Sequence, residues 1–227
     1  MSPLALVSVS DKTNIIPFCK DLVENFGYNI ISSGGTAKYL IDAKIPVIKV
    51  ADFTQSPEIL EGRVKTLHPK IHGGILAKRS NKQHAKEIEV NNIELIDLVV
   101  VNLYPFKKKV EEKCSWEEAI ENIDIGGPSM IRSAAKNHAD VAVLVDPNQY
   151  INYIEELKKG PISEDFKTKL AFKAFQHTAS YDAAISNWIS KEKNLMSSTF
   201  IESFPLVKEL RYGENPHQKA SWYGLKN

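Results

Sequence analysis

The chain has 227 residues, of which 43% are hydrophobic and 25% charged, a composition typical of globular proteins and unlike fibrous or disordered ones. Its 29 basic and 28 acidic residues give a net charge of +1, which excludes recruitment of nucleic acid or anionic membranes by global charge. No segment reaches the roughly 20 apolar residues that span a bilayer, and the two isolated cysteines suit a reducing compartment, so we expect a cytoplasmic protein.

Short apolar strands alternate with amphipathic helices over residues 1–146. Strands are expected at residues 4–9, 28–32, 45–50, 96–103 and 141–145. Helices are expected at residues 12–26, 37–43, 82–91, 116–123 and 129–137, the first of them starting at Ser10-Asp11, with another start at Ser56-Pro57-Glu58. This alternation predicts an α/β fold with a parallel sheet covered by helices on both faces, which binds ligands at the carboxyl ends of its strands.

The alternation stops near Asp146. Two helical stretches follow at residues 147–159 and 163–191, and Ser163 is the expected N-cap of the second. We interpret residues 147–199 as a helical connector. Residues 200–227 carry strand-like pieces but are too few to bury a core of their own, so they look like the start of a further domain.

Three turns after predicted strands carry residue types that bind phosphate. Glycines let the backbone approach an anion, and the following helix N-terminus presents free N–H groups. Each turn alone also fits an ordinary loop, and neither common glycine-rich phosphate motif occurs in this sequence. Taken together they indicate a phosphorylated ligand; the turns are Ser10-Asp11-Lys12-Thr13, Ser33-Gly34-Gly35-Thr36 and Asp124-Ile125-Gly126-Gly127.

Several basic residues are further candidates. The segment 63–70, RVKTLHPK, suits a loop over an anionic ligand, although a solvated surface loop has the same composition. Lys136 fits either a desolvated acid or base or a partner of a helix dipole, and its place near a helix end favours the dipole. His68 and His72 are spaced for one metal ion, but a third ligand is missing, so we expect no metal site.

Seven segments together resemble one family, the bifunctional purine biosynthesis proteins with IMP cyclohydrolase and AICAR transformylase activities. They are SVSDKT (Ser8–Thr13), SSGGTAKYL (Ser32–Leu40), EGRVKTLHPKIHGGILA (Glu61–Ala77), VNLYPF (Val101–Phe106), ENIDIGGPSMIRSAAKNH (Glu121–His138), AFQHTASYD (Ala174–Asp182) and LRYGENPHQKA (Leu210–Ala220). The resemblance implies that residues 1–146 form a methylglyoxal-synthase-like cyclohydrolase domain. It also implies that residues 200–227 are the truncated start of the transformylase domain.

The implied reaction closes the purine ring of formamido-imidazole-carboxamide ribotide (FAICAR) to give IMP with loss of water. It needs no cofactor, and formyl-tetrahydrofolate would serve only a full-length transformylase that formylates AICAR. The implied ligands are thus the purine ribonucleotides FAICAR, IMP and AICAR. Family members are generally dimeric, so a homodimer is one option, and the oligomeric state stays open.

The resemblance also implies roles for single residues. Lys65 and Asn102 would face the formyl oxygen, while Asp124 and Lys136 would move protons at the carboxamide with help from Tyr104. Which of Lys65, Asp124 and Lys136 is the essential proton-transfer group stays open. Phosphate and ribose would be held by Ser10, Lys12, Thr13, Ser33, Gly34, Gly35, Thr36, Arg63, Thr66, Gly126 and Gly127. Arg211 and Tyr212 would belong to an incomplete second site.

Two other interpretations use the same fold. One is a non-catalytic nucleotide-sensing module, which would keep the phosphate site and show no turnover. The other is a methylglyoxal synthase, but the segments RVKT, NLYPF and AAKNH resemble the cyclohydrolase branch instead.

Overall fold

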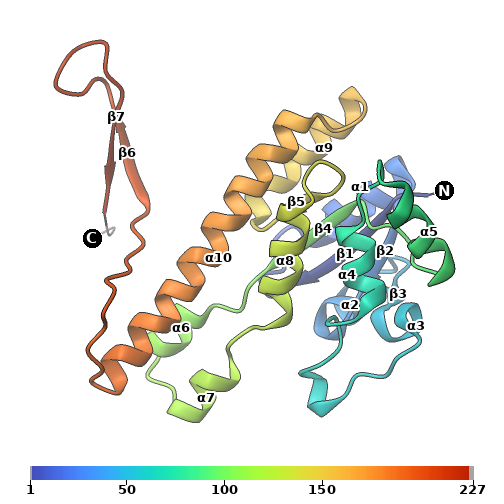
Figure 1. The fold of residues 1–227 in the computed structure, drawn as a ribbon, viewed down its shortest axis with the longest axis horizontal. Helices are drawn as coiled ribbons and strands as arrows, with labels where there is room; N and C mark the ends of the chain where they lie inside the picture. Colours follow the sequence, from blue (N-terminus) through green and yellow to red (C-terminus); the bar gives the residue numbers. More distant parts are fainter. Residues whose placement is uncertain (1, 225–227) are drawn as a thin grey trace. The chain divides into compact units, whose positions relative to one another are not determined.

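The computed structural model describes residues 2–224, which fall into two units divided between Thr178 and Ala179 (Figure 1). The first unit is built on a five-stranded sheet in which every neighbouring pair is parallel, in the order β3-β2-β1-β4-β5. The strands are β1 (Leu4–Val9), β2 (Asn29–Ser32), β3 (Ile48–Lys49), β4 (Leu98–Asn102) and β5 (Ala142–Leu144). The predicted α/β fold with a parallel sheet is confirmed.

Helices cover both faces of this sheet. The connection from β1 to β2 and the connection from β4 to β5 run in opposite directions, and right-handed crossovers therefore place their helices on opposite faces. Burial on both faces explains why β1 and β4 are continuous apolar runs rather than alternating ones. The helices are α1 (Ile15–Phe26), α2 (Gly34–Asp42), α3 (Val50–Thr54), α4 (Pro69–Leu76), α5 (Lys82–Val90), α6 (Phe106–Glu111), α7 (Trp116–Glu121) and α8 (Gly126–Lys136).

Two more helices follow the sheet. A 3-10 turn (Pro147–Gln149) leads into α9 (Tyr150–Lys159), and α10 (Glu164–Glu192) follows. Ser163 precedes α10 and caps it as predicted from the sequence, because its hydroxyl accepts a hydrogen bond from Phe166 N. The ring of Tyr150 stacks on Phe18 of α1 with ring centroids 4.4 Å apart. Residues 147–178 therefore belong to the first unit, whereas the sequence interpretation assigned them to a separate connector.

The second unit contains the end of α10 and an antiparallel hairpin. Its strands are β6 (Leu206–Leu210) and β7 (Ala220–Tyr223), which account for the strand-like pieces expected after residue 200. Within this unit the Ser203 hydroxyl donates to the Ser180 hydroxyl at 3.0 Å. Residues 225–227 lie outside the described residues. Within residues 2–224, no helix is both long enough and apolar enough to cross a membrane.

Several elements differ from the sequence prediction, among them α8, which starts at Gly126 instead of Ser129. Helix α1 begins at Ile15 after Asn14 in the left-handed conformation, so Ser10 and Asp11 do not cap it. The strand expected at 45–50 shortens to two residues because Val50 already starts α3. The helix expected at Ser56 is absent from the described chain, where a loop leads into a 3-10 turn at Leu60–Gly62. Helix α6 was not predicted, because its lysine-rich sequence resembles a solvated turn.

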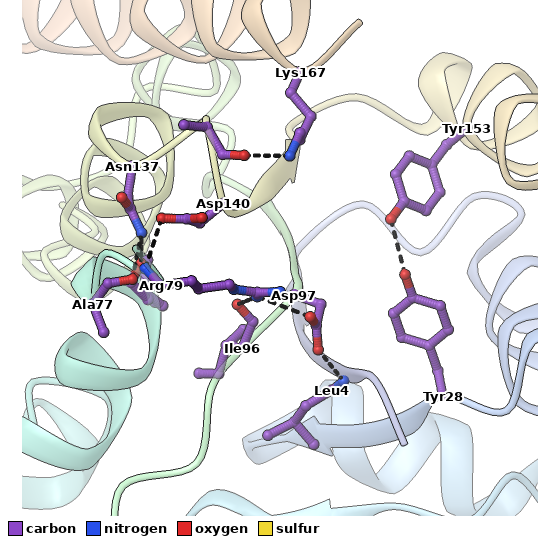
Figure 2. Close-up of polar contacts among 12 residues, drawn as sticks. Leu4, Tyr28, Ala77, Arg79, Ile96, Asp97, Asn137, Asp140, Tyr153 and Lys167 are labelled. Carbon is purple, nitrogen blue, oxygen red and sulfur yellow. Dashed lines mark hydrogen bonds and ion pairs between the residues drawn. The ribbon is translucent and has the colours of Figure 1, made fainter. Parts of the chain in front are cut away.

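A polar network ties together the amino ends of the strands (Figure 2). The carboxylate of Asp97, just before β4, accepts hydrogen bonds from Leu4 N at 2.7 Å and from the Arg79 guanidinium at 2.8 Å. Asn137, at the end of α8, donates its side-chain amide to the carbonyls of Ile75 and Ala77 at the end of α4. These bonds satisfy buried backbone groups at this edge of the sheet and fix the ends of α4 and α8 together.

We expect Asn137→Ala to destabilise the fold, because it leaves the Ile75 and Ala77 carbonyls without their donor at a buried position. The free energy of unfolding should fall by about 1–3 kcal/mol, the cost of unsatisfied buried polar groups. Urea denaturation measures it. Asn25→Ala is the matched control, since Asn25 is exposed and its side chain bonds only to Asp21 among the contacts of residues 2–224. Equal stability of the two variants would contradict this account.

Candidate functional site

The candidate site lies at the carboxyl edge of the sheet, the edge formed by the C-terminal ends of the parallel strands. Here β1 and β4 lie side by side but lead into connections that run in opposite directions, the usual position of a ligand crevice in such sheets. Asn102, at the end of β4, accepts hydrogen bonds from Ser10 N at 2.7 Å and Asp11 N at 2.8 Å. Its amide nitrogen donates to Asp11 O at 3.0 Å. This side chain holds the loop after β1, so the structure gives it a positioning task.

The loop after β1 is also held from within. The Asp11 carboxylate accepts a hydrogen bond from Thr13 N at 2.9 Å, and the hydrogen bonds from Thr13 lower the pKa of Asp11. Lys12 is half-buried in the same loop. The turn predicted to bind phosphate is therefore a preformed loop at the carboxyl edge.

The turn after β2 forms the N-terminus of α2. Ser33 is extended and, within the described chain, its hydroxyl makes no capping hydrogen bond. The first backbone bond of the helix runs from Ala37 N to Ser33 O at 3.2 Å, so the preceding N–H groups of Gly34, Gly35 and Thr36 have no partner inside the helix. The Thr36 hydroxyl is engaged elsewhere, because it donates to Val9 O at 3.0 Å and accepts from Val9 N at 3.1 Å. Helix α2 thus offers backbone donors and the Ser33 hydroxyl, while the hydroxyl of Thr36 ties the helix to β1.

Lys65 extends toward this helix end. Its ammonium Nζ lies 3.6 Å from where a Cβ on Gly34 would stand. The same nitrogen is 3.9 Å from Oε2 of Glu58. Its positive charge also lowers the pKa of Asp124, against the larger effect of burial, which raises it.

Asp124 caps the N-terminus of α8. Its Oδ1 accepts a hydrogen bond from Gly127 N at 2.8 Å. Burial raises the pKa of Asp124 above the ordinary 3.8, and this effect outweighs the opposing influence of the Gly127 N–H and of Lys65. The buried Thr66 hydroxyl lies only 2.7 Å from where a Cβ on Gly126 would stand, so a glycine is needed at that position. The N-termini of α2 and α8, Lys65 and Asp124 therefore meet at one place.

Of the expected site residues, Lys136 lies at the other end of α8, and Arg63 is engaged in an ion pair. Lys136 is exposed at the C-terminal end of α8, about 15 Å along the helix axis from Gly126 at roughly 1.5 Å per residue. It adjoins Asn137 and the network at the amino ends of the strands (Figure 2), so within one chain it does not approach Asp124. Arg63 is exposed and forms an ion pair with Glu121 of α7. The dipole interpretation of Lys136 fits its place in the last turn of α8.

The remaining candidates are placed as follows. Tyr104 follows β4 at the carboxyl edge and is 52% exposed. Arg211 and Tyr212 lie in the second unit, in the loop of the β6–β7 hairpin, and both are exposed. The ring of His68 caps α4 by accepting from Lys70 N, and His72 pairs with the Ser133 hydroxyl at 3.0 Å. Residues 2–224 contain no group of three metal-ligating side chains.

Sequence reasoning missed Glu58. It lines a cleft of about 460 Å³ beside the N-terminus of α2, together with Ser33, Gly34, Ala37, Lys38, Ile41, Lys49, Val50 and Ala51. The signal in the sequence is weak, because Glu58 and Lys65 are seven positions apart with a glycine between them, and only the fold of the intervening turn brings them together.

Comparison with known proteins identifies the domains of the chain. A family model described as an MGS-like domain matches residues 14–129, and one described as the AICARFT/IMPCHase bienzyme matches residues 134–227. The chain belongs to the family of MGS-like domains, and its C-terminal residues match the AICARFT/IMPCHase bienzyme model. The resemblance carried by the seven sequence segments is confirmed, as is the methylglyoxal-synthase-like fold.

Individual relatives are close in sequence. The bifunctional purine biosynthesis protein PurH of Prochlorococcus marinus strain MIT 9515 is 85% identical over 227 residues, which are 100% of this chain and 44% of that protein. PurH of strain NATL2A is 59% identical over 225 residues, 99% of this chain and 43% of the relative. A crystal structure of ForH superposes with a TM-score of 0.73 at 34% identity and covers 83% of this chain and 100% of its own. The chain thus spans less than half the length of the two PurH relatives.

Asp124→Asn tests the electrostatics of the site. Because burial raises the folded-state pKa of Asp124, the folded protein holds this proton more tightly than the unfolded chain, and ionised Asp124 costs stability at neutral pH. The contribution of Asp124 to stability is full below pH 3.8 and is lost as pH rises through its raised folded pKa. Asparagine keeps an acceptor for Gly127 N and carries no charge. We therefore expect Asp124→Asn to be at least as stable as the wild type at pH 7.

Thermal unfolding of both proteins between pH 4 and pH 8 measures this. The difference in Tm should grow in favour of Asp124→Asn as pH rises. Asp42→Asn, at the exposed end of α2, is the control and should follow the wild type. A variant clearly less stable than the wild type at pH 7 would mean that the charge of Asp124 stabilises the fold.

Proposed function

We propose that this chain is an IMP cyclohydrolase, which closes the purine ring of FAICAR to form IMP and water in purine biosynthesis. The observation that carries the proposal is that Lys65 and its neighbour Thr66 lie against the N-termini of α2 and α8, with the part-buried Asp124 carboxyl at the second of these helix ends. The match of residues 134–227 to the AICARFT/IMPCHase bienzyme model supports it. The names of the PurH relatives, bifunctional purine biosynthesis proteins, agree with this substrate class.

The phosphate of the nucleotide would bind at the N-terminus of α2. Three backbone N–H groups without helical partners and the Ser33 hydroxyl are suitable donors there, and the positive end of the helix favours an anion. Lys12, from the loop that Asn102 holds, would add a positive charge. Because the whole chain is nearly neutral, such local donors must supply the affinity for an anionic ligand.

The ring closure needs charge stabilisation and proton transfer. The carboxamide nitrogen attacks the formyl carbon and gives up one proton, while the formyl oxygen gains one and becomes a hydroxyl. That hydroxyl then leaves as water, and the formamido nitrogen loses its proton, so one water is released overall. The Lys65 ammonium would stabilise negative charge on the formyl oxygen, which is the kind of interaction that contributes most to such reactions.

Asp124 would exchange the protons. A carboxyl whose pKa is raised by burial is a stronger base than an exposed one, and its pKa lies nearer to neutral pH, where one group must both take up and release a proton. Tyr104, at the end of β4, would help to orient the carboxamide. The formyl group is already attached to the substrate, so we propose that the step needs neither a cofactor nor formyl-tetrahydrofolate.

We expect Lys65→Ala to lower kcat for IMP formation from FAICAR by about 10²–10³, the usual effect of removing one oxyanion-stabilising group. The rate is followed by the change in ultraviolet absorbance on ring closure. Lys82→Ala, which removes an exposed lysine at the start of α5, is the control and should keep the wild-type rate. Wild-type turnover in Lys65→Ala would show that Lys65 is not catalytic. Tight IMP binding without any turnover by the unmodified chain would favour a nucleotide-sensing module instead.

A further inference from the structure

A tight turn holds Glu58 opposite Lys65. Ile59 and Val64 exchange two backbone hydrogen bonds, Ile59 N to Val64 O at 3.1 Å and Val64 N to Ile59 O at 3.3 Å, and so form an antiparallel pair. Residues that flank such a hydrogen-bonded pair form the next pair, in which the side chains lie closer together. Here that next pair is Glu58 and Lys65, with Oε2 and Nζ 3.9 Å apart.

The turn between them is strained. Leu60, Glu61 and Gly62 follow one another with φ of +52°, +55° and +87°, a conformation that side chains other than glycine rarely adopt. Such strain persists where the surrounding structure specifies it, and it concentrates at functional sites. Gly62 lies between the two charges, since a Cβ there would be 3.6 Å from both Glu58 Oε2 and Lys65 Nζ. The strained turn therefore determines how the carboxylate and the ammonium face each other.

Electrostatics explain why Lys65 needs a negative partner here. Its ammonium lies beside Gly34 at the N-terminus of α2, which carries partial positive charge, and two positive groups at this distance repel each other. The Asp124 carboxylate lies at the other helix end, where its Oδ1 accepts a hydrogen bond from Gly127 N. Glu58 supplies a carboxylate from the side of the cleft.

We propose that Glu58 is a positioning residue that holds the Lys65 ammonium over the N-terminus of α2, in the place where the reaction needs it. This rests on the proposed function, because it concerns the same site. Glu58 acts through Lys65 and does not touch the reacting atoms. The side chains of Glu58 and Lys65 are 39% and 31% exposed. An ion pair this exposed and 3.9 Å long contributes little to stability, so its removal leaves the protein folded.

Glu58→Gln tests the proposal, with Glu61→Gln as the matched control in the same turn. We expect Glu58→Gln to lower kcat by about 10- to 100-fold, the effect of a small misplacement of a catalytic group. The KM for FAICAR should stay the same or fall, because a negative charge beside the phosphate site is removed. Glu58→Asp keeps the charge and should recover part of kcat, whereas Glu61→Gln should match the wild type. Turnover of Glu58→Gln equal to that of Glu61→Gln would overturn the proposal. So would a raised KM with unchanged kcat, which would mark Glu58 as a substrate contact.

A second measurement does not depend on activity. The rate at which an amine-reactive acetylating reagent modifies Lys65, followed by peptide mass spectrometry, should rise in Glu58→Gln and not in Glu61→Gln. Unchanged labelling in both variants would overturn the pairing. If the wild-type chain forms no IMP, the proposed function fails, and these labelling rates alone decide whether Glu58 holds Lys65.

Discussion

At the carboxyl edge, the connections that follow β1 and β4 run in opposite directions, and the side chain of Asn102 holds the loop after β1. Its amide makes three hydrogen bonds with the backbone of Ser10 and Asp11, so the loop after β1 is fixed to the end of β4. The Thr36 hydroxyl joins the start of α2 to Val9 in the same way. With these buried polar side chains occupied by the backbone, the helix N-termini around them remain in fixed positions, and a ligand meets donors that need no rearrangement.

The two edges of the sheet have different polar properties. At the amino ends of the strands, Asp97, Arg79 and Asn137 pair with backbone groups and with one another, which suits a structural network. At the carboxyl edge, the first N–H groups of α2 have no partner inside the helix, and a buried carboxyl has a raised pKa. Both edges thus have structural hydrogen bonds, and the carboxyl edge also has backbone N–H groups without a partner inside their helix. Lys136 lies at the amino edge, at the opposite end of α8 from Asp124.

Local sequence patterns predicted the parts of this fold that burial determines. The apolar runs of β1 and β4 are buried on both faces, and the capping residue Ser163 starts α10, so both could be expected from sequence alone. Predictions failed where distant contacts decide the conformation. The segment after Ser56 forms a left-handed turn instead of a helix, and the glycines at 126 and 127 start α8 instead of preceding it. Glu58 was missed because only the left-handed turn at residues 60–62 brings it beside Lys65, seven positions further along the chain.

The charges at the site are close to balance before any ligand binds. Lys65 and the N-terminus of α2 are positive, Glu58 is a part-exposed carboxylate, and Asp124 is a part-buried carboxyl whose pKa is raised by burial. An incoming phosphate would neutralise the helix end and so weaken the repulsion that Lys65 experiences there. The ammonium could then remain over the cleft, with Glu58 as its fixed partner, while the reacting atoms bring their own developing negative charge. Under the proposed function the phosphate would therefore do more than anchor the nucleotide, because it would make the position of Lys65 electrostatically favourable.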